Sequence, residues 1–412
     1  MSCFFKLLAF VLFFQYHFCS CIVAQHKIRG KNKYVAAKDV FDVLSGIFRK
    51  EIVLDTLELK YPERKDSVKT TVIAVLPSVN YSVITKWAFG GFLNGSYYLN
   101  KKGNTNMSTS DLLVIYTLRQ QLIAKLKSTT WTKDNGYNLI GDWRFMKYPS
   151  FTFGLGSDAA IRPGFLIDYS YLRVYQTVYR ELSGYFYIGI GYKLDYHYNV
   201  KEYSNGIVSD FDIYTEGNQG KTLASGPTIN FLYDSRENLV NPLGGRFYGY
   251  LSYRYNSKLT GSSTDWQSIT LDARKYIKFP TKSTNILALW SYNWFTFGGN
   301  PSYLDLPSTG WDAGDNQGRG YIQGRFRSNN LLSLEAEYRF SITRNKLLGG
   351  VVFSNVQTVS EIKTMHFKEA YPAAGAGIRL KINKHTNSNL SIDVALGVNG
   401  SKTIFVNLGE IF

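Results

Sequence analysis

The feature that most constrains this chain is an alternation of apolar and polar residues with a period of two, running from about residue 72 to the C terminus. In its clearest stretch every second residue is large and apolar: Phe186, Ile188, Ile190, Tyr192, Leu194, Tyr196 and Tyr198. The residues between them are small or polar: Gly189, Gly191, Lys193, Asp195, His197 and Asn199. Because successive side chains of a β-strand point to opposite faces, this pattern predicts long strands with one apolar face.

The same alternation recurs nearer the C terminus with charged residues on the polar face. Over residues 332–341 the polar set is Ser333, Glu335, Glu337, Arg339 and Ser341. Over residues 390–397 it is Ser391, Asp393, Ala395 and Gly397. Strands of a soluble sandwich are mostly paired across a dry core. Here each apolar face is long enough to cross hydrocarbon, and the polar face would line a wet lumen.

Sixteen such segments are expected, at 72–83, 86–99, 109–118, 120–131, 136–147, 167–180, 185–200, 225–236, 245–257, 265–279, 285–298, 331–342, 346–358, 370–383, 389–398 and 402–412. An even number is typical of single-chain bacterial barrels. Closure of the sheet pairs the backbone N–H and C=O groups of its edge strands, which lipid cannot hydrogen-bond. We therefore predict an all-β fold, a transmembrane antiparallel β-barrel of about 16 strands over residues 72–412.

The first 24 residues have the pattern of a secretory signal peptide. Lys6 precedes an apolar stretch over residues 7–14, and Ile22-Val23-Ala24 forms an acceptable cleavage site. The apolar stretch is shorter than the roughly 20 residues that a spanning helix needs. A lipoprotein site at Cys21 is the alternative, but its surrounding residues fit that motif poorly.

All three cysteines of the chain lie within this leader: Cys3, Cys19 and Cys21. The mature chain is therefore expected to have none, which excludes disulfides, cysteine metal sites and thiol catalysis. A chain without cysteines suits an oxidising compartment such as the periplasm.

Residues 25–71 are expected to form a short periplasmic segment with a helix over residues 36–50. Five apolar residues there have helical spacing: Val40, Phe41, Leu44, Ile47 and Phe48. The segment is too short for a domain with a sizeable core of its own. Whether the helix enters the lumen is left open by the sequence.

Composition agrees with a barrel and gives no sign of nucleic-acid binding. Aromatic residues make up 16% of the chain, with 31 Tyr, as expected for aromatic girdles at two membrane interfaces. The formal net charge is +16. Such a surplus can bind nucleic acid, but no nucleic-acid motif is present. We interpret it as lining a lumen or meeting anionic lipid, with outer-membrane lipid and lipopolysaccharide as partners.

The longest predicted connection, 299–330, is rich in glycine and contains Gly318-Arg319-Gly320-Tyr321 and Gly324-Arg325-Phe326-Arg327. The strand after it reads Glu335-Ala336-Glu337-Tyr338-Arg339-Phe340. Together these resemble the sixth extracellular loop and following strand of the BamA/TamA outer-membrane assembly superfamily, also called the bacterial surface antigen family. The loop also lies between the eleventh and twelfth predicted strands, as in that family.

Three further stretches carry the resemblance. Asp234, Arg236, Pro242 and Gly245 are similar to a signature between two mid-barrel strands of the family. Tyr148-Pro149 with Gly154-Leu155-Gly156 resembles a recurring barrel stretch. The C-terminal Phe412, with Ile404, Val406 and Leu408 in step, resembles the signal by which barrels are recognised for insertion. The resemblance covers about 72–412 and implies a branch without POTRA domains, because 25–71 cannot hold even one.

The resemblance implies that the loop enters the lumen and that Arg319 clamps it to the wall. Gly318 and Gly320 would allow a sharp turn and a close approach, and the planar guanidinium of Arg319 suits a carboxylate. Glu335 and Glu337 face the lumen and are the expected partners.

There is one departure from the family pattern within the expected clamp. Family members often carry an aspartate on the strand after the glutamate strand, where this chain has Asn355. That substitution makes Glu337 the better partner for Arg319. The alternative is that Arg319 is an ordinary solvated loop residue.

Nothing in the sequence indicates an enzyme. There is no Gly-x-Ser-x-Gly motif, and His, Asp and Glu do not have metal-ligand spacing. Four histidines lie after the leader: His26, His197, His366 and His385. Only His197 is on a lumen-facing strand, with Asp195 on the same face. We therefore expect no catalytic residues, no metal and no cofactor.

The function implied by the resemblance is assistance with insertion of barrel proteins into the outer membrane, or with translocation across it. Its partners would be unfolded barrel-protein clients and periplasmic proteins. Whether a separate chain supplies the missing periplasmic domains is left open by the sequence. Weak pairing of the first and last strands would let the seam open, helped by nearby glycines: Gly90, Gly91, Gly95, Gly397 and Gly400.

Two other functions stay open. The first is a passive or gated channel for small solutes, with lumen charges that bind anions: Arg246, Arg254, Asp272, Arg274, Lys278, Arg339, Arg379 and Lys381. These charges could instead pair with one another and fill the lumen. The second is a structural surface antigen.

Overall fold

The computed structural model describes residues 37–40, 42–43, 71–82, 86–100, 105–203, 208–214, 220–384 and 387–412. The predicted leader and most of the segment 25–71 lie outside these residues. Within the described part of that segment, Val40, Asp42 and Val43 have helical backbone.

The fold is one antiparallel sheet in which each long strand pairs with the next along the chain. The sixteen long strands are β1 (Thr71–Ser82), β2 (Lys86–Tyr97), β3 (Ser108–Thr117), β4 (Leu122–Trp131), β5 (Asn138–Lys147), β7 (Phe165–Ser183), β8 (Phe186–Tyr203), β9 (Lys221–Asp234), β10 (Arg246–Asn256), β11 (Trp266–Lys278), β12 (Ile286–Phe297), β13 (Asn330–Ser341), β14 (Leu348–Val359), β15 (Tyr371–Asn383), β16 (Ser388–Gly397) and β17 (Lys402–Leu408). The short β6 (Ser150–Thr152), which the sequence did not indicate, pairs with β7. The predicted all-β class and the number of long strands are confirmed.

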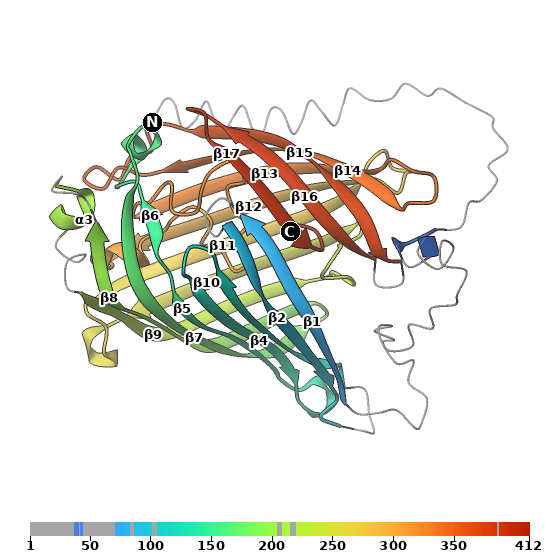
Figure 1. Cartoon of the computed structure of the whole chain (residues 1–412). Helices are drawn as coiled ribbons and strands as arrows, with labels where there is room; N and C mark the ends of the chain where they lie inside the picture. The colour runs from blue at the N-terminus through green and yellow to red at the C-terminus, as the bar shows by residue number, and fades with distance from the viewer. Residues whose placement is uncertain are drawn as a thin grey trace. The chain divides into compact units, whose positions relative to one another are not determined.

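Figure 1 shows the tilted strands curving around a lumen. The remaining described elements are short: the 3-10 helices η1 (Lys133–Asn135), η2 (Ser157–Ala160), η3 (Lys258–Thr260) and η4 (Tyr303–Asp305), and the helix α3 (Asp210–Ile213). Within the described ranges no helix is long and apolar enough to cross a membrane.

The two faces of the sheet follow the sequence alternation. On β8, Ile190 is 73% exposed on the outer face whereas Asp195 on the inner face is 3% exposed. On β16, Ile392 and Val394 are exposed and Asp393 is buried. Charged side chains are thus inside and branched apolar side chains outside. That arrangement is the reverse of a water-soluble protein and matches a barrel with a lipid-facing surface.

The sheet has two different ends. At one end, which we call the turn end, the connections are 184–185, 235–245, 279–285, 342–347 and 384–387. At the other, the loop end, are the long connections 148–164, 204–220, 298–329 and 360–370. The described part of the N-terminal segment contacts the turn end. Lys38 N donates to Asn345 O at 2.9 Å, and Lys384 Nζ lies 2.7 Å from Asp42 Oδ1.

The expected closure of the sheet is not found. The ladders of the described strands run from β1–β2 to β16–β17, and none of them joins β17 to β1, although residues of these two strands have Cα atoms within 8 Å. One cause is the length of β17. A last strand over 402–412 was expected, but β17 ends at Leu408. Gly409 then has φ +98° and the chain turns away from the strand.

Candidate functional site

The connection between β12 and β13, residues 298–329, is buried within the barrel. Loops normally run over a protein surface and are exposed. Here several large side chains are almost fully enclosed: Tyr303, Leu306, Arg319, Tyr321 and Phe326. We call residues 298–329 the inner loop. Its contacts with the wall define the candidate site.

Arg319 is the most strongly bound residue of the inner loop, with no exposed surface. Its Nε donates to Glu335 Oε1 at 2.8 Å and its Nη1 to Asp393 Oδ2 at 2.7 Å. Its Nη2 pairs with both Glu335 and Glu337. Arg319 is thus held by carboxylates from β13 and β16, and charge-assisted bonds of this kind are the strong ones.

Two further wall residues complete the surroundings of Arg319. The guanidinium lies 3.5 Å from the ring centroid of Phe353, in a cation–π arrangement. Asn355 Nδ2 donates to the main-chain carbonyl of Arg319 at 2.7 Å. Both residues are on β14. Asn355 therefore binds the backbone of the inner loop. The third carboxylate that binds Arg319 is that of Asp393 on β16, two strands beyond β14.

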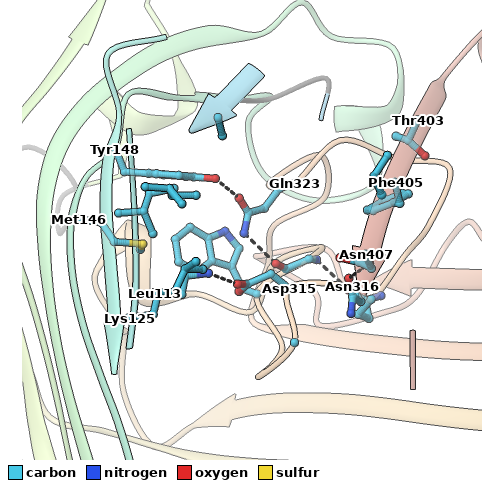
Figure 2. Close-up of a pocket in the computed structure, with 18 of the residues that line it drawn as sticks. Leu113, Lys125, Met146, Tyr148, Asp315, Asn316, Gln323, Thr403, Phe405 and Asn407 are labelled. Carbon is cyan, nitrogen blue, oxygen red and sulfur yellow. Dashed lines mark hydrogen bonds and ion pairs between the residues drawn. The ribbon is translucent and has the colours of Figure 1, made fainter. Parts of the chain in front are cut away.

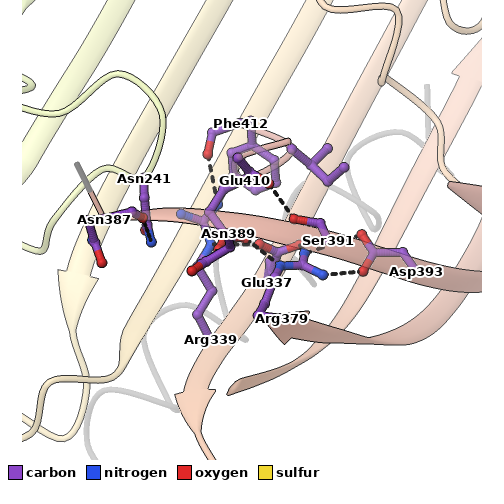
Figure 3. Close-up of polar contacts among 12 residues, drawn as sticks. Asn241, Glu337, Arg339, Arg379, Asn387, Asn389, Ser391, Asp393, Glu410 and Phe412 are labelled. Atoms are coloured by element: carbon purple, nitrogen blue, oxygen red, sulfur yellow. Dashed lines mark hydrogen bonds and ion pairs between the residues drawn. The ribbon is translucent and has the colours of Figure 1, made fainter. Parts of the chain in front are cut away.

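Two of the three carboxylates that bind Arg319, those of Glu337 and Asp393, are shared with other arginines (Figure 3). Arg339 Nε donates to Glu337 at 2.6 Å. Arg379 pairs with Asp393, and its Nε donates to Glu410 at 2.7 Å. The sequence placed Arg339 and Arg379 on the lumen face. Their shared partners could not be read from it, because they depend on register across several strands.

Both predicted glycines adopt the left-handed region that glycine favours. Gly318 has φ +80° and Gly320 has φ +104°. A Cβ atom on Gly320 would lie 2.5 Å from Ala373 Cβ, and one on Gly318 would lie 2.7 Å from Thr309 Cγ2. These positions therefore need glycine both for backbone conformation and for space.

Tyr321, the last residue of the motif, binds main-chain groups at the loop end. Its hydroxyl donates to Pro372 O at 2.6 Å and accepts from Val398 N at 3.1 Å. Its ring packs edge-on against Phe326, with centroids 5.1 Å apart. The four residues of the motif are thus all anchored against the wall.

Replacing Gly320 by alanine is expected to destabilise the folded barrel. Overpacking typically costs about 1–3 kcal/mol, and the left-handed backbone adds about 1–2 kcal/mol. The measurement is the temperature at which the folded form is lost, read from gel mobility without boiling. The matched control is Gly400→Ala, because Gly400 has φ +72° but open space around it. Equal shifts in the two variants would contradict the packing argument.

The inner loop contacts the barrel on both sides of the unpaired seam. On the β17 side, Gly320 N donates to Thr403 Oγ1 at 2.9 Å, and Ser401 Oγ donates to Gly320 O at 2.7 Å. On the other side, Asp315 pairs with Lys125 of β4 and lies 3.1 Å from Arg144 Nη1 of β5. The loop therefore bridges the seam from inside.

A cavity of about 450 Å³ lies between these two sets of contacts (Figure 2). It is partly open and is lined by the inner loop and by residues of β2, β3, β4, β5 and β17. Burial raises the pKa of Asp315, but Lys125 and Arg144 outweigh that effect and hold its pKa below the usual range. Asp315 is therefore ionised at neutral pH and keeps its two pairs there.

A second buried pair of side chains lies at the start of the inner loop. Asp305 Oδ1 lies 3.6 Å from His197 Nδ1 on β8. His197 stacks on Tyr171 with ring centroids 4.5 Å apart, and its Nδ1 has no hydrogen-bond partner among the described residues. Asp195, the acid that might have served a catalytic histidine, instead binds Arg254 at 2.6 Å. His197 and Asp195 are thus packed within the wall.

Stability is expected to fall as pH rises, through Asp305. Burial, with the nearby charge of Asp195, raises the pKa of Asp305 to about 8; the unfolded value is about 3.9. Between these two values of pH the folded barrel holds a proton that the unfolded chain has released. The stabilisation that comes from holding this proton is lost as pH rises through about 8. When pH is raised from about 5 to about 8, the Asp305→Asn variant should lose less thermal stability than the wild type loses. The control is Asp158→Asn, an exposed carboxyl at the same end; equal slopes in the Asp305 variant and the wild type would refute the assignment.

No metal site accompanies these contacts. In the part of the chain that the structure describes, no group of three or more His, Cys, Asp or Glu side chains is arranged to hold an ion.

The predicted signature in the β9–β10 turn forms a compact structural unit at the turn end. Arg236 makes a two-pronged contact with Asp234, at 2.9 and 2.8 Å. Its guanidinium lies 4.2 Å from the ring centroid of Tyr248. Pro242 is buried, and Gly245, with φ +89°, donates to Tyr276 O at 2.7 Å. None of these contacts is with Arg319 itself, and they stabilise the turn.

The C-terminal residues are divided between the wall and the lumen. Val406 pairs with Ile392 and Leu408 with Leu390, both within the β16–β17 ladder. Phe412, expected at the end of the strand, is only 4% exposed and lies inside. Its ring is 5.0 Å from that of Trp290, and its carbonyl accepts from Arg339 Nη2 at 2.7 Å. Gly409 and the charged Glu410 on the apolar face of the pattern were the sequence signals for this bend.

Comparison with known proteins finds similarity in structure only. No protein-family model matches the sequence, and no curated protein matches it. The structure of BamA from Haemophilus ducreyi lacking POTRA domains 1–3 superposes with a TM-score of 0.55 at 14% identity, covering 83% of this chain and 71% of that one.

Two structures of CdiB give similar values. CdiB from Acinetobacter baumannii has a TM-score of 0.54 at 12% identity, and CdiB from Escherichia coli 0.53 at 9%. Each comparison covers 83% of this chain, but only 60% and 63% of the respective CdiB chains. The chain thus has the fold of these outer-membrane barrels, as the resemblance in its sequence predicted.

Proposed function

We propose that this chain is an integral outer-membrane barrel that assists the insertion of other barrel proteins into that membrane, or their translocation across it. The observation that carries the proposal is the unpaired seam between β1 and β17, bridged from inside by the inner loop. A strand edge leaves a row of backbone donors and acceptors unpaired, and such a row readily pairs with another chain.

The inner loop would control access to this edge. Gly320 holds β17, Asp315 holds β4 and β5, and Arg319 fixes the loop between them. A client strand would pair with the free edge while the remaining strands keep the barrel intact. No nucleotide or bond cleavage is needed, because folding of the client in the membrane supplies the driving force.

The charges of the lumen favour this function over an open channel. Arg254 is paired with Asp195, Arg274 with Asp272 at 2.7 Å, and Arg379 with Asp393. Most of the cations predicted to line the lumen are thus paired with carboxylates, as the alternative interpretation of these charges expected. The inner loop, meanwhile, occupies the space that a solute would need. We expect mostly closed and erratic conductance in planar bilayers rather than one steady pore.

Depletion of the protein in its host tests the proposal. Outer membranes isolated after depletion should show a selective loss of folded barrel proteins, with their precursors accumulating in the periplasm. Re-expression of the wild-type chain should reverse the loss. An unchanged set of outer-membrane proteins would refute a general assembly role.

A further inference from the structure

A second cavity, of about 590 Å³, opens at the turn end of the lumen. We call it the turn-end vestibule. It is lined by residues of β10 to β16 and their turns, by Ala37 and Lys38, and by Glu410 of the C-terminal tail. Its volume is within the range of pockets that hold ligands. The inner loop does not line it, and it adjoins the site described above through Arg339 and Arg379, which share Glu337 and Asp393 with Arg319.

The vestibule has a large excess of positive charge. Eight lysines and arginines line it, against two glutamates. Three of the arginines are neutralised: Arg246 by Glu237, Arg379 by Glu410 and Arg339 by Glu337. Lys384 pairs with Asp42. The other four have no carboxylate partner among the described residues: Lys38, Lys278, Lys346 and Lys381.

The vestibule is also lined by a buried hydrogen-bond donor that has no acceptor among the described residues. Arg339 is 6% exposed and lines the vestibule. Its Nε and Nη2 are satisfied by Glu337 and by the carbonyl of Phe412, but its Nη1 has no hydrogen-bond partner among the described residues. Buried polar groups are normally paired, and one that is not calls for an explanation.

The chain's own tail indicates the chemistry of the ligand. Glu410 lies in the vestibule, where it accepts from Arg379 Nε at 2.7 Å and from Asn389 Nδ2 at 2.6 Å (Figure 3). The carbonyl of Phe412 binds Arg339 beside it. The vestibule thus already holds a peptide segment in cis, through the one side-chain carboxylate of Glu410 and a main-chain oxygen of Phe412.

The distribution of the four lysines without a carboxylate partner, of which Lys381 donates to the amide side chain of Asn387, distinguishes a peptide from a compact anion. Lys278 ends β11, Lys346 lies in the β13–β14 turn, Lys381 is on β15 and Lys38 precedes β1. Four separate segments therefore supply the charges around the cavity. Distributed cations match carboxylates spaced along an extended chain, whereas a phosphate needs donors that converge on one point.

We propose that the turn-end vestibule is a binding site for an acidic peptide segment of a partner protein. Lys278, Lys346 and Lys381 would contact its side-chain carboxylates, and Arg339 Nη1 would bind one further oxygen. This inference does not depend on the proposed assembly function, because it concerns only recognition at the turn end.

The test is binding of a fluorescein-labelled peptide of alternating Glu and Gly to the detergent-solubilised full chain, measured by fluorescence anisotropy. Exchange of Lys278, Lys346 and Lys381 for Gln should weaken binding roughly 10-fold. The charge-matched control exchanges three loop-end lysines for Gln: Lys221, Lys258 and Lys363. It should change affinity less than about 2-fold. Glu410→Gln should strengthen binding, because it removes the carboxylate already bound in cis.

Three results would overturn the proposal. The first is an equal loss of binding in the vestibule variant and the loop-end control, which would show that binding depends only on the net charge of the molecule. The second is equal affinity for the same peptide with Gln in place of Glu. The third is binding of inorganic phosphate to the vestibule without binding of the peptide, which would indicate a small-anion site instead.

Discussion

Replacement of Arg319 by alanine is expected to release the inner loop and convert a mostly closed barrel into an open one. The change leaves Glu335, Glu337 and Asp393 buried with part of their compensating charge removed. Loss of one partner of a buried ion pair typically costs about 3–5 kcal/mol. Two measurements check the result: a lower temperature for loss of the folded form, and a larger, steadier conductance in planar bilayers.

Two companion variants separate the charge of Arg319 from its shape. Arg319→Lys keeps the charge but cannot form the forked contacts with three carboxylates, so an intermediate effect is expected. Adding Glu335→Gln and Glu337→Gln to Arg319→Ala removes the unbalanced charges and should recover part of the thermal stability, while the conductance stays high. Wild-type stability and conductance in Arg319→Ala would show that the arginine does not hold the loop.

A disulfide across the seam is expected to abolish function while leaving the fold intact. Outside residues 1–24 the chain has no cysteine, so engineered pairs would be the only thiols. Ile73 and Val75 of β1 and Ile404 of β17 are exposed on the outer face. A panel would pair position 73 or 75 with position 404 or 406, since a disulfide needs Cα atoms roughly 4.4–6.8 Å apart. If β1 must separate from β17, oxidised variants should not support assembly of other barrel proteins in depleted cells.

The control disulfide joins two strands that are already paired. Val394 and Ile404 face each other in the β16–β17 register, so Val394→Cys with Ile404→Cys adds a cross-link without closing the seam. This variant should work in both redox states, and a reductant should restore the seam variants. Normal assembly with a fully oxidised seam would mean that clients do not enter there.

Most of the sheet could be predicted from the sequence because its pattern is local. The alternation through β12 predicted residues 285–298, and the strand is Ile286–Phe297. Turn residues and the alternation of polarity are sufficient to predict where such a strand begins and ends. A strand with one apolar and one polar face can place its apolar side chains toward lipid in only one register. The three-residue β6 has too few residues for a periodicity to be recognised.

The candidate site could be predicted only in part, because its partners depend on contacts between distant strands. Arg319 and the two glutamates of β13 were expected from the resemblance. Asp393 was recognised only as a lumen-facing residue, and its contact with Arg319 crosses from β16 to the inner loop.

The inward course of the tail was also missed. Phe412 is in step with Ile404, Val406 and Leu408, which led to the prediction of a longer strand. Glu410 falls on the same apolar face and interrupts the alternation, so it and Gly409 were signals for the bend.

The measurement that tests the central claim most directly is folding of a denatured barrel protein into liposomes that contain the purified chain. If the seam between β1 and β17 admits client strands, folding should be faster than into empty liposomes. Oxidation of a seam disulfide should remove that acceleration, and the Val394–Ile404 cross-link should preserve it. Equal folding rates with and without the chain, or acceleration that persists with the seam locked, would contradict the account.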